Sequence, residues 1–161
     1  MTVLQWPKFR EVVRLGAFAG LAGGLAEILW IWFYAALTGA DAAPVVRGVS
    51  VAVGAGTAAA PVALGIGIHM VLAVALGIAL ASALRPLFAR LPGNLGRYGV
   101  VLAALALVWA INFFVVLPQI SPSFVHLVPY QISLLSKLLF GFTAATVLRS
   151  RPAAQPAAPR A

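Results

Sequence analysis

The stretch "LAGGLAEILWIWFY", residues 21–34, decides the fold, because it places one carboxylate, Glu27, inside an otherwise apolar run. The run extends from Leu15 to Leu37 without another charge. About 20 consecutive apolar residues are enough for a helix to cross the roughly 30 Å hydrocarbon core of a bilayer. The stretch therefore predicts a membrane-spanning helix that holds an ionisable group near its middle.

The composition extends this conclusion to the whole chain. Its 161 residues are 63% hydrophobic and only 9% charged, with a mean hydropathy of +1.04. A soluble domain of this length normally carries about a quarter charged residues, so the expected partner is the lipid bilayer. The formal charge of +8 comes from Lys and Arg residues spaced singly between apolar runs, which argues against nucleic acid. The chain has no cysteine, which excludes disulfides and thiolate chemistry.

Three further apolar segments reach spanning length, at about residues 61–84, 98–117 and 129–148. The expected fold class is therefore all-α, an integral membrane bundle of four transmembrane helices. Between the first two spans, Pro44 is a favoured first-turn residue. It predicts a short interfacial helix over about residues 43–53, with a re-entrant segment as the alternative.

The chain is expected to divide into three parts. Residues 1–14 form a cytoplasmic N-terminal segment, residues 15–148 the transmembrane domain, and residues 149–161 a disordered Pro/Ala tail in the cytoplasm.

The positions of the basic residues predict the orientation in the membrane. Cytoplasmic loops carry an excess of Lys and Arg. Here Arg47 alone lies on one side of the predicted spans. Nine basic residues lie on the other side: Lys8, Arg10, Arg14, Arg85, Arg90, Arg97, Arg149, Arg151 and Arg160. Both termini are therefore expected in the cytoplasm, and a bacterial inner membrane is the expected location.

Each predicted span carries one polar residue, and all four fall in the outer half of the bundle. These residues are Glu27, His69, Asn112 and Lys137. At 1.5 Å per residue they lie roughly 9–15 Å from the outer ends of their helices. Gly and Ala recur at four-residue spacing beside Glu27, His69 and Lys137, and small residues let membrane helices approach closely. These three side chains are therefore expected on helix-packing faces, whereas the direction of Asn112 is left open.

The polar layer has a structural and a functional interpretation. A lone charge at a helix centre costs about 2.5–3.5 kcal/mol, and opposite charges about 4 Å apart recover up to about 4 kcal/mol at an effective dielectric near 20. Glu27 and Lys137 are thus expected to pair, either to hold the bundle together or as a functional site, with His69 as the next candidate partner. His69 and Asn112 have simpler roles as hydrogen bonders between helices.

No catalytic residue, cofactor or metal site is predicted. His126 is expected in an exposed loop, away from His69, so the two histidines do not suggest a haem site. No phosphate loop, zinc spacing or nucleophile elbow is present. The aromatic residues are expected mainly in the interfacial belt of the membrane: Trp6, Trp30, Trp32, Trp109, Tyr34, Tyr98 and Tyr130.

Two stretches repeat a pattern of a polar residue followed by small residues four and eight positions later. They are "HMVLAVALGIALA" (69–81) and "KLLFGFTAATVL" (137–148), which suggest a duplicated helical hairpin in parallel orientation. The segments "GIGIHMVLAVALGIALA" and "SLLSKLLFGFTAATVL" resemble small four-helix bacterial membrane proteins, of which the YagU-like proteins are the nearest. That resemblance implies a membrane fold without an established activity. Such proteins tend to have a histidine where this chain has Lys137, which argues against a shared histidine metal site.

Two functions follow as hypotheses for a non-enzymatic membrane protein. In the first, Glu27 and Lys137 form a proton- or charge-sensitive pair, completed by His69 and Asn112, in a pocket that binds or transports a small solute. In the second, the chain is a structural accessory subunit that docks to a larger membrane complex or forms a homo-oligomer. A cavity that touches all four polar residues would favour the first hypothesis.

Overall fold

The computed structural model describes residues 9–91 and 93–149, and throughout these ranges the secondary structure is helical, with no strand. The expected segment 1–14 is described from residue 9, and the expected tail only at residue 149. The remaining residues of both lie outside the described ranges.

Four helices are long and apolar enough to cross a membrane, which confirms the all-α membrane bundle. They are α1 (Phe9–Thr38), α3 (Pro61–Phe88), α4 with its continuation (Asn94–Ile120), and α6 (Tyr130–Arg149). The first helix begins six residues before the predicted span. The polar residues of its first turns extend the helix beyond its apolar part, because hydropathy marks the membrane-embedded stretch and not the helix end.

The third span changes its helix type near one end. Helix α4 (Asn94–Ile111) passes into a π-helix, η1 (Asn112–Val116), and then into α5 (Leu117–Ile120). In a π-helix each turn takes in an extra residue. Side chains after Ile111 therefore no longer follow the 3.6-residue period of α4.

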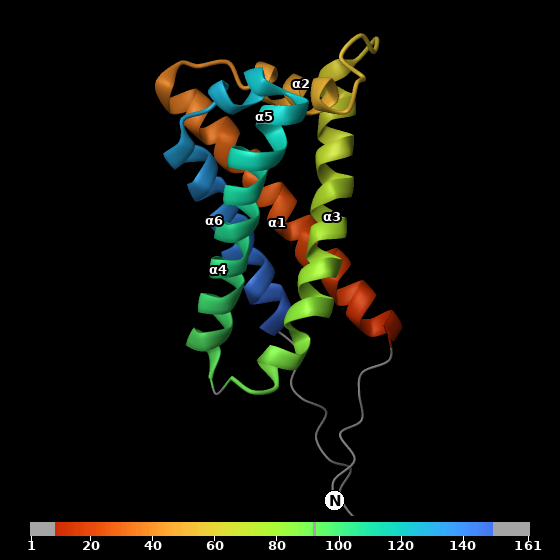
Figure 1. Cartoon of the computed structure of the whole chain (residues 1–161), viewed down its shortest axis with the longest axis vertical. Helices are drawn as coiled ribbons and strands as arrows, with labels where there is room; N and C mark the ends of the chain where they lie inside the picture. The colour runs from red at the N-terminus through yellow and green to blue at the C-terminus, as the bar shows by residue number, and fades with distance from the viewer. Residues whose placement is uncertain (1–8, 92, 150–161) are drawn as a thin grey trace, which may run out of the picture.

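The predicted short helix is present as α2 (Ala43–Ala52), and it lies across one end of the bundle (Figure 1). Asp41 accepts a hydrogen bond from the backbone N–H of Ala43, with 2.8 Å between the two atoms. At the other end of α2, the Ser50 hydroxyl donates a 2.6 Å hydrogen bond to the carbonyl of Pro61. Helix α2 is thus tied to the beginning of α3. The same end of the bundle, called the α2 end below, carries α5 and the 3₁₀-helix η2 (Pro122–His126).

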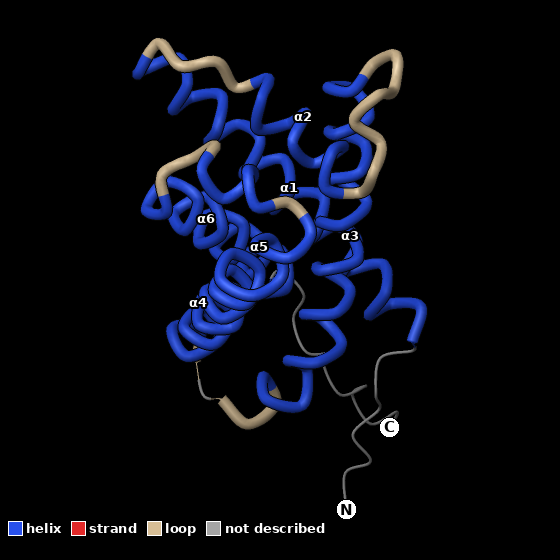
Figure 2. Tube along the Cα trace, turned by 45° about the horizontal axis from the view of Figure 1, so that its top comes forward, coloured by secondary structure: helices blue, strands red, loops and turns tan. Residues whose placement is uncertain are grey.

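The long helices pack in the order α3, α1, α6, α4. Helix α1 packs along both α3 and α6, and α4 packs on α6, but α3 and α4 barely contact each other (Figures 1 and 2). In a duplicated hairpin in parallel orientation, α4 would correspond to α1 and α6 to α3. The contact between α3 and α4 would then be as extensive as that between α1 and α6. The expected symmetry is therefore wrong at this interface, and the bundle has an open side.

Glycines bring α1 and α3 together backbone to backbone. A Cβ atom added at Gly20 would lie 2.3 Å from the carbonyl oxygen of Ala73, and one at Gly77 would lie 2.3 Å from that of Gly16. No side chain fits at these separations. The predicted small-residue faces of α1 and α3 are thus confirmed as packing faces.

The main apolar core fills the half of the bundle away from the α2 end. Its members come from all four long helices: Ala19, Ala73, Leu80, Val101, Leu105, Phe140, Ala144 and Ala145. In the α2 half a smaller cluster holds η1, α5 and η2 together through Phe113, Leu117 and Val125. The space between these two clusters contains the predicted polar residues.

Candidate functional site

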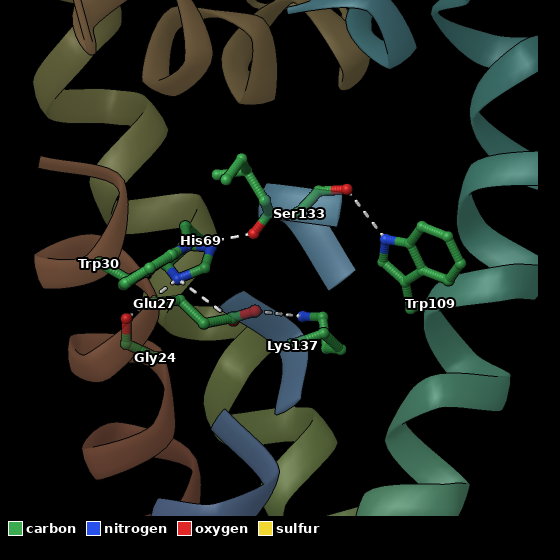
Figure 3. A network of polar contacts seen from close by, with 8 residues as sticks. Gly24, Glu27, Trp30, His69, Trp109, Ser133 and Lys137 are labelled. Carbon is green, nitrogen blue, oxygen red and sulfur yellow. Dashed lines mark hydrogen bonds and ion pairs between the residues drawn. The ribbon is translucent and has the colours of Figure 1, made fainter. Parts of the chain in front are cut away.

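Glu27 lies on the packing face of α1 and is buried, with 8% of its side chain exposed. Its Oε1 atom is 2.7 Å from Nζ of Lys137 on α6, the separation of a charge-assisted hydrogen bond (Figure 3). The pairing expected from their common depth is therefore confirmed.

His69 approaches the same carboxylate from α3. Its Nε2 atom lies 3.2 Å from the carbonyl oxygen of Gly24 and 3.8 Å from Oε2 of Glu27. A carbonyl only accepts hydrogen bonds, so Nε2 is assigned the proton and donates to Gly24, which leaves Nδ1 as the acceptor nitrogen. A second proton on the ring would make His69 an ion-pair partner of Glu27. Glu27, His69 and Lys137 form one charged cluster, called the Glu27 cluster below.

The three members of the cluster differ in their access to the surrounding space. The exposed fraction is 26% for the His69 side chain and 20% for Lys137, but 8% for Glu27. Lys137 also lies 5.3 Å from the centre of the Phe140 ring, where its charge meets the ring face. Of its three N–H donors, Glu27 accepts one, and no other acceptor lies within hydrogen-bond distance among the described residues. Glu27 thus lies between the two basic groups and is the least exposed of the three (Figure 3).

A cavity of about 460 Å³ lies beside this cluster, under α2. All four polar residues predicted from the sequence line it: Glu27, His69, Asn112 and Lys137. The roof is apolar and comes from Val45, Val46 and Val49 of α2, and most of the remaining wall is also apolar. Leu72 on α3 and Asn112, the first residue of η1, are both exposed lining residues, as are Trp32, Val53 and Ile120. Leu72 and Asn112 mark a side opening of the pocket where α3 and α4 barely meet.

Asn112 lies at the rim of the pocket, and its side chain has no hydrogen-bond partner among the described residues. The expected role of Asn112 as a hydrogen bonder between helices is therefore wrong. Asn112 begins the π-helix η1, and next to it the ring of Phe113 is buried and stacks on Trp109 at 5.5 Å. The amide of Asn112 is left facing the opening.

Several polar residues of the site were not predicted. The indole N–H of Trp109 donates to the Ser133 hydroxyl at 3.0 Å (Figure 3). That hydroxyl donates in turn to the Tyr130 carbonyl at 3.0 Å. Ser136 also lines the pocket and is 6% exposed, yet its hydroxyl has no hydrogen bond within the described part of the chain. The sequence feature that could have predicted the two serines is their spacing with Lys137. Ser133, Ser136 and Lys137 fall on one face of α6.

Two tryptophans expected in the interfacial belt have a further role inside the bundle. Trp30 donates its indole N–H to the carbonyl of Ile132 at 3.1 Å, and Trp109 bonds Ser133. Both contacts are made with the first turn of α6. They hold the part of α6 that carries Ser136 and Lys137 in place beside α1 and α4.

His126 ends η2 and is exposed, as expected, and it is not a lining residue of the pocket. No group of three or more metal-ligating His, Asp or Glu side chains occurs among residues 9–91 and 93–149.

Comparisons with known proteins found no match to a family model, to a curated protein or to a solved structure. The likeness to YagU-like proteins therefore stays a prediction.

Proposed function

We propose that this multi-pass membrane protein binds a small solute, and protons with it, in the pocket beside the Glu27 cluster. The observation that carries the proposal is that one cavity touches Glu27, His69, Asn112 and Lys137 together. These residues come from four different spans, and a bundle that used its polar groups only for packing would enclose them.

The energetics support a site with two charged members. At 2.7 Å and an effective dielectric near 20, the attraction between Glu27 and Lys137 is about 6 kcal/mol. Two isolated charges in the membrane cost about 5–7 kcal/mol together. The pair is close to neutral in free energy, so it adds little stability of its own. Ionisable groups within a membrane commonly mark solute or proton pathways.

The hydrogen-bonding capacity of the wall supports binding as well. Lys137 retains N–H donors, the Ser136 hydroxyl makes no hydrogen bond to another described residue, and the Asn112 amide lies at the rim. Buried polar groups normally have partners. A bound solute would supply the missing ones, and pockets of roughly 300–1,000 Å³ with a few convergent polar groups are typical of ligand sites.

In this proposal the protein lies in a bacterial inner membrane with both termini in the cytoplasm, so that the pocket lies toward the outer side. The role is binding or transport and not catalysis. The accessory-subunit hypothesis remains the alternative outcome of the test that follows.

Thiol labelling of the pocket wall tests the proposal, since the chain has no native cysteine. Ser136→Cys places a thiol in the pocket with little change in size, and Ala144→Cys on the same helix provides a control, since Ala144 is 0% exposed. With the protein in lipid vesicles, N-ethylmaleimide should label Ser136→Cys at least about ten times faster than Ala144→Cys. Equal and slow labelling of both would show a closed interior and favour the accessory subunit.

A further inference from the structure

We propose that the solute is an amphiphile with an apolar tail and one anionic headgroup, a carboxylate or a phosphate. It reaches the pocket sideways from the bilayer, between α3 and α4. This inference rests on the function proposed above and adds the chemical class of the ligand and its route.

The sign of the headgroup follows from which groups face the cavity. Lys137 and His69 both line the cavity and are more exposed than Glu27, which lies between them. The unused hydrogen-bonding groups include several donors: the remaining N–H groups of Lys137, the hydroxyl of Ser136 and the amide N–H groups of Asn112, beside the acceptor Nδ1 of His69. Charge-assisted hydrogen bonds from such donors to an anion are about twice as strong as neutral ones. The wall is therefore built to receive a negative group.

The tail follows from the remainder of the wall. Valines of α2 form the roof, and Ile66 and Leu72 of α3, Val108 of α4 and Leu117 of α5 also line the pocket. The side opening lies between two membrane-spanning helices that barely contact each other, so it faces the acyl chains of the bilayer. An apolar tail can remain in this lipid-like environment while the headgroup moves to Lys137. A fully hydrophilic anion has no comparable route.

Charge balance requires a proton to accompany the anion. In the empty pocket Glu27 neutralises Lys137. When the headgroup takes the place of Glu27 at Nζ, the carboxylate of Glu27 loses its partner. A proton from water then binds Nδ1 of His69, and the imidazolium pairs with Oε2 of Glu27, which is already 3.8 Å from Nε2. One anion and one proton enter together, no bond to carbon forms or breaks, and the net charge of the pocket is unchanged.

No other titratable group of the described residues faces this exchange. Helix α1 contributes Glu27, α3 contributes His69 and α6 contributes Lys137, whereas α4 presents uncharged groups and α2 an apolar roof. Arg47 of α2 is exposed and is not a lining residue.

Binding of three probes with the same twelve-carbon chain tests the headgroup. Full-length protein in phosphatidylcholine nanodiscs is titrated with dodecanoate, dodecanol or dodecyltrimethylammonium by calorimetry, with empty nanodiscs as the blank. We expect dodecanoate to bind at least about tenfold more tightly than the other two. Its affinity should fall as the pH rises, by up to about tenfold per pH unit, because one proton is taken up with each anion.

Variants separate the parts of the proposal. Glu27→Gln removes the competing carboxylate, so dodecanoate should bind more tightly and with little pH dependence. Lys137→Arg should retain the preference for the anion, whereas Lys137→Met should lose it. The double variant Glu27→Gln/Lys137→Met carries neither charge and serves if Lys137→Met alone does not fold. His69→Gln should bind dodecanoate more weakly than the wild type near neutral pH.

The outcomes are distinct. Equal affinity for the three probes would overturn the anionic class, and if Ser136→Cys is still labelled, the pocket remains a binding site for another solute. A pH-independent affinity in the wild type would overturn the proton exchange. Phosphatidic acid added to the nanodiscs distinguishes the two sources of the headgroup: competition with dodecanoate indicates a membrane lipid, and no competition indicates a free single-chain acid. Both results keep the anionic class.

Discussion

Breaking the Glu27–Lys137 pair one residue at a time should destabilise the protein unequally. Removing one partner of a buried pair typically costs about 3–5 kcal/mol, because the other charge is left uncompensated. Glu27→Gln leaves the Lys137 charge with a neutral amide oxygen and the face of Phe140, 5.3 Å away, but with no opposite charge among the described residues near it. Lys137→Met leaves Glu27 beside His69, 3.8 Å away, which can take up a proton. Glu27→Gln should therefore cost the larger free energy of unfolding.

The double variant Glu27→Gln/Lys137→Met should recover most of this loss. The attraction of about 6 kcal/mol is nearly offset by the cost of burying two charges, so removing both should change the free energy of unfolding by only about 1–2 kcal/mol. The coupling energy between the two sites is then at least about 3 kcal/mol, well above the few tenths that are typical of independent sites.

Reversible unfolding by guanidinium chloride in a non-ionic detergent measures the four free energies of this cycle. Lowering the pH should stabilise Lys137→Met relative to Glu27→Gln, since protonated His69 then replaces the lost lysine as the partner of Glu27. Additive losses in the double variant would refute the pairing as an energetic interaction. Equal losses in the two single variants, at every pH, would refute the role assigned to His69.

The remaining predictions concern packing and topology. Gly20→Leu should lower the free energy of unfolding by about 3 kcal/mol or more, because even its Cβ atom meets the backbone of α3. Gly67→Leu lies in open space on α3 and should change stability little. Thermal unfolding in detergent compares the two variants, and similar losses would contradict the close approach of α1 and α3. Ser50→Ala removes the hydrogen bond that ties α2 to α3 and should cost about 1 kcal/mol in the same assay; no loss would show that this bond does not stabilise α2. For the orientation, an impermeant thiol reagent outside the cell should label a cysteine at Ser123 and not one at Gly93, and the reverse pattern would place the termini outside.

Hydropathy alone was enough to predict the spans, because a run of apolar residues long enough for a bilayer has few other stable environments. The Glu27–Lys137 pair was also predictable. The rise per residue sets the depth of each side chain, and Lys137 is the only Lys or Arg inside the predicted spans at the depth of Glu27.

The pocket itself was not predictable, because it depends on which helices are neighbours. Spacing shows which face of a helix packs, but not what it packs against. The glycines of α1 bring α3 to one side, Phe140 of α6 packs against Gly23 on the other, and α4 is left beside α6 alone. The apparent repeat in the sequence suggested a symmetric bundle, which would have closed the opening.

Asn112 shows a second reason why the site could not be fully predicted from the sequence. Its direction was left open, and the 3.6-residue period of α4 could not have given it, because that period ends at Ile111 and the next five residues form a π-helix. Ser136 was overlooked for a different reason, because serine is common at helix contacts in membranes and only its lack of a partner marks it as part of the site.

The depth of the Glu27 cluster has an electrical consequence. Glu27 lies about 15 Å from the end of α1, which is about half of a hydrocarbon core of roughly 30 Å. A lone anion that moved from water to Lys137 would cross about half of the membrane voltage, and at 100 mV this is worth about 1.2 kcal/mol, or about eightfold in affinity. An anion and a proton that enter from the same side cross the field as a neutral couple. Occupancy of the pocket would then follow the concentrations of acid and proton on either side, at any resting potential of the cell.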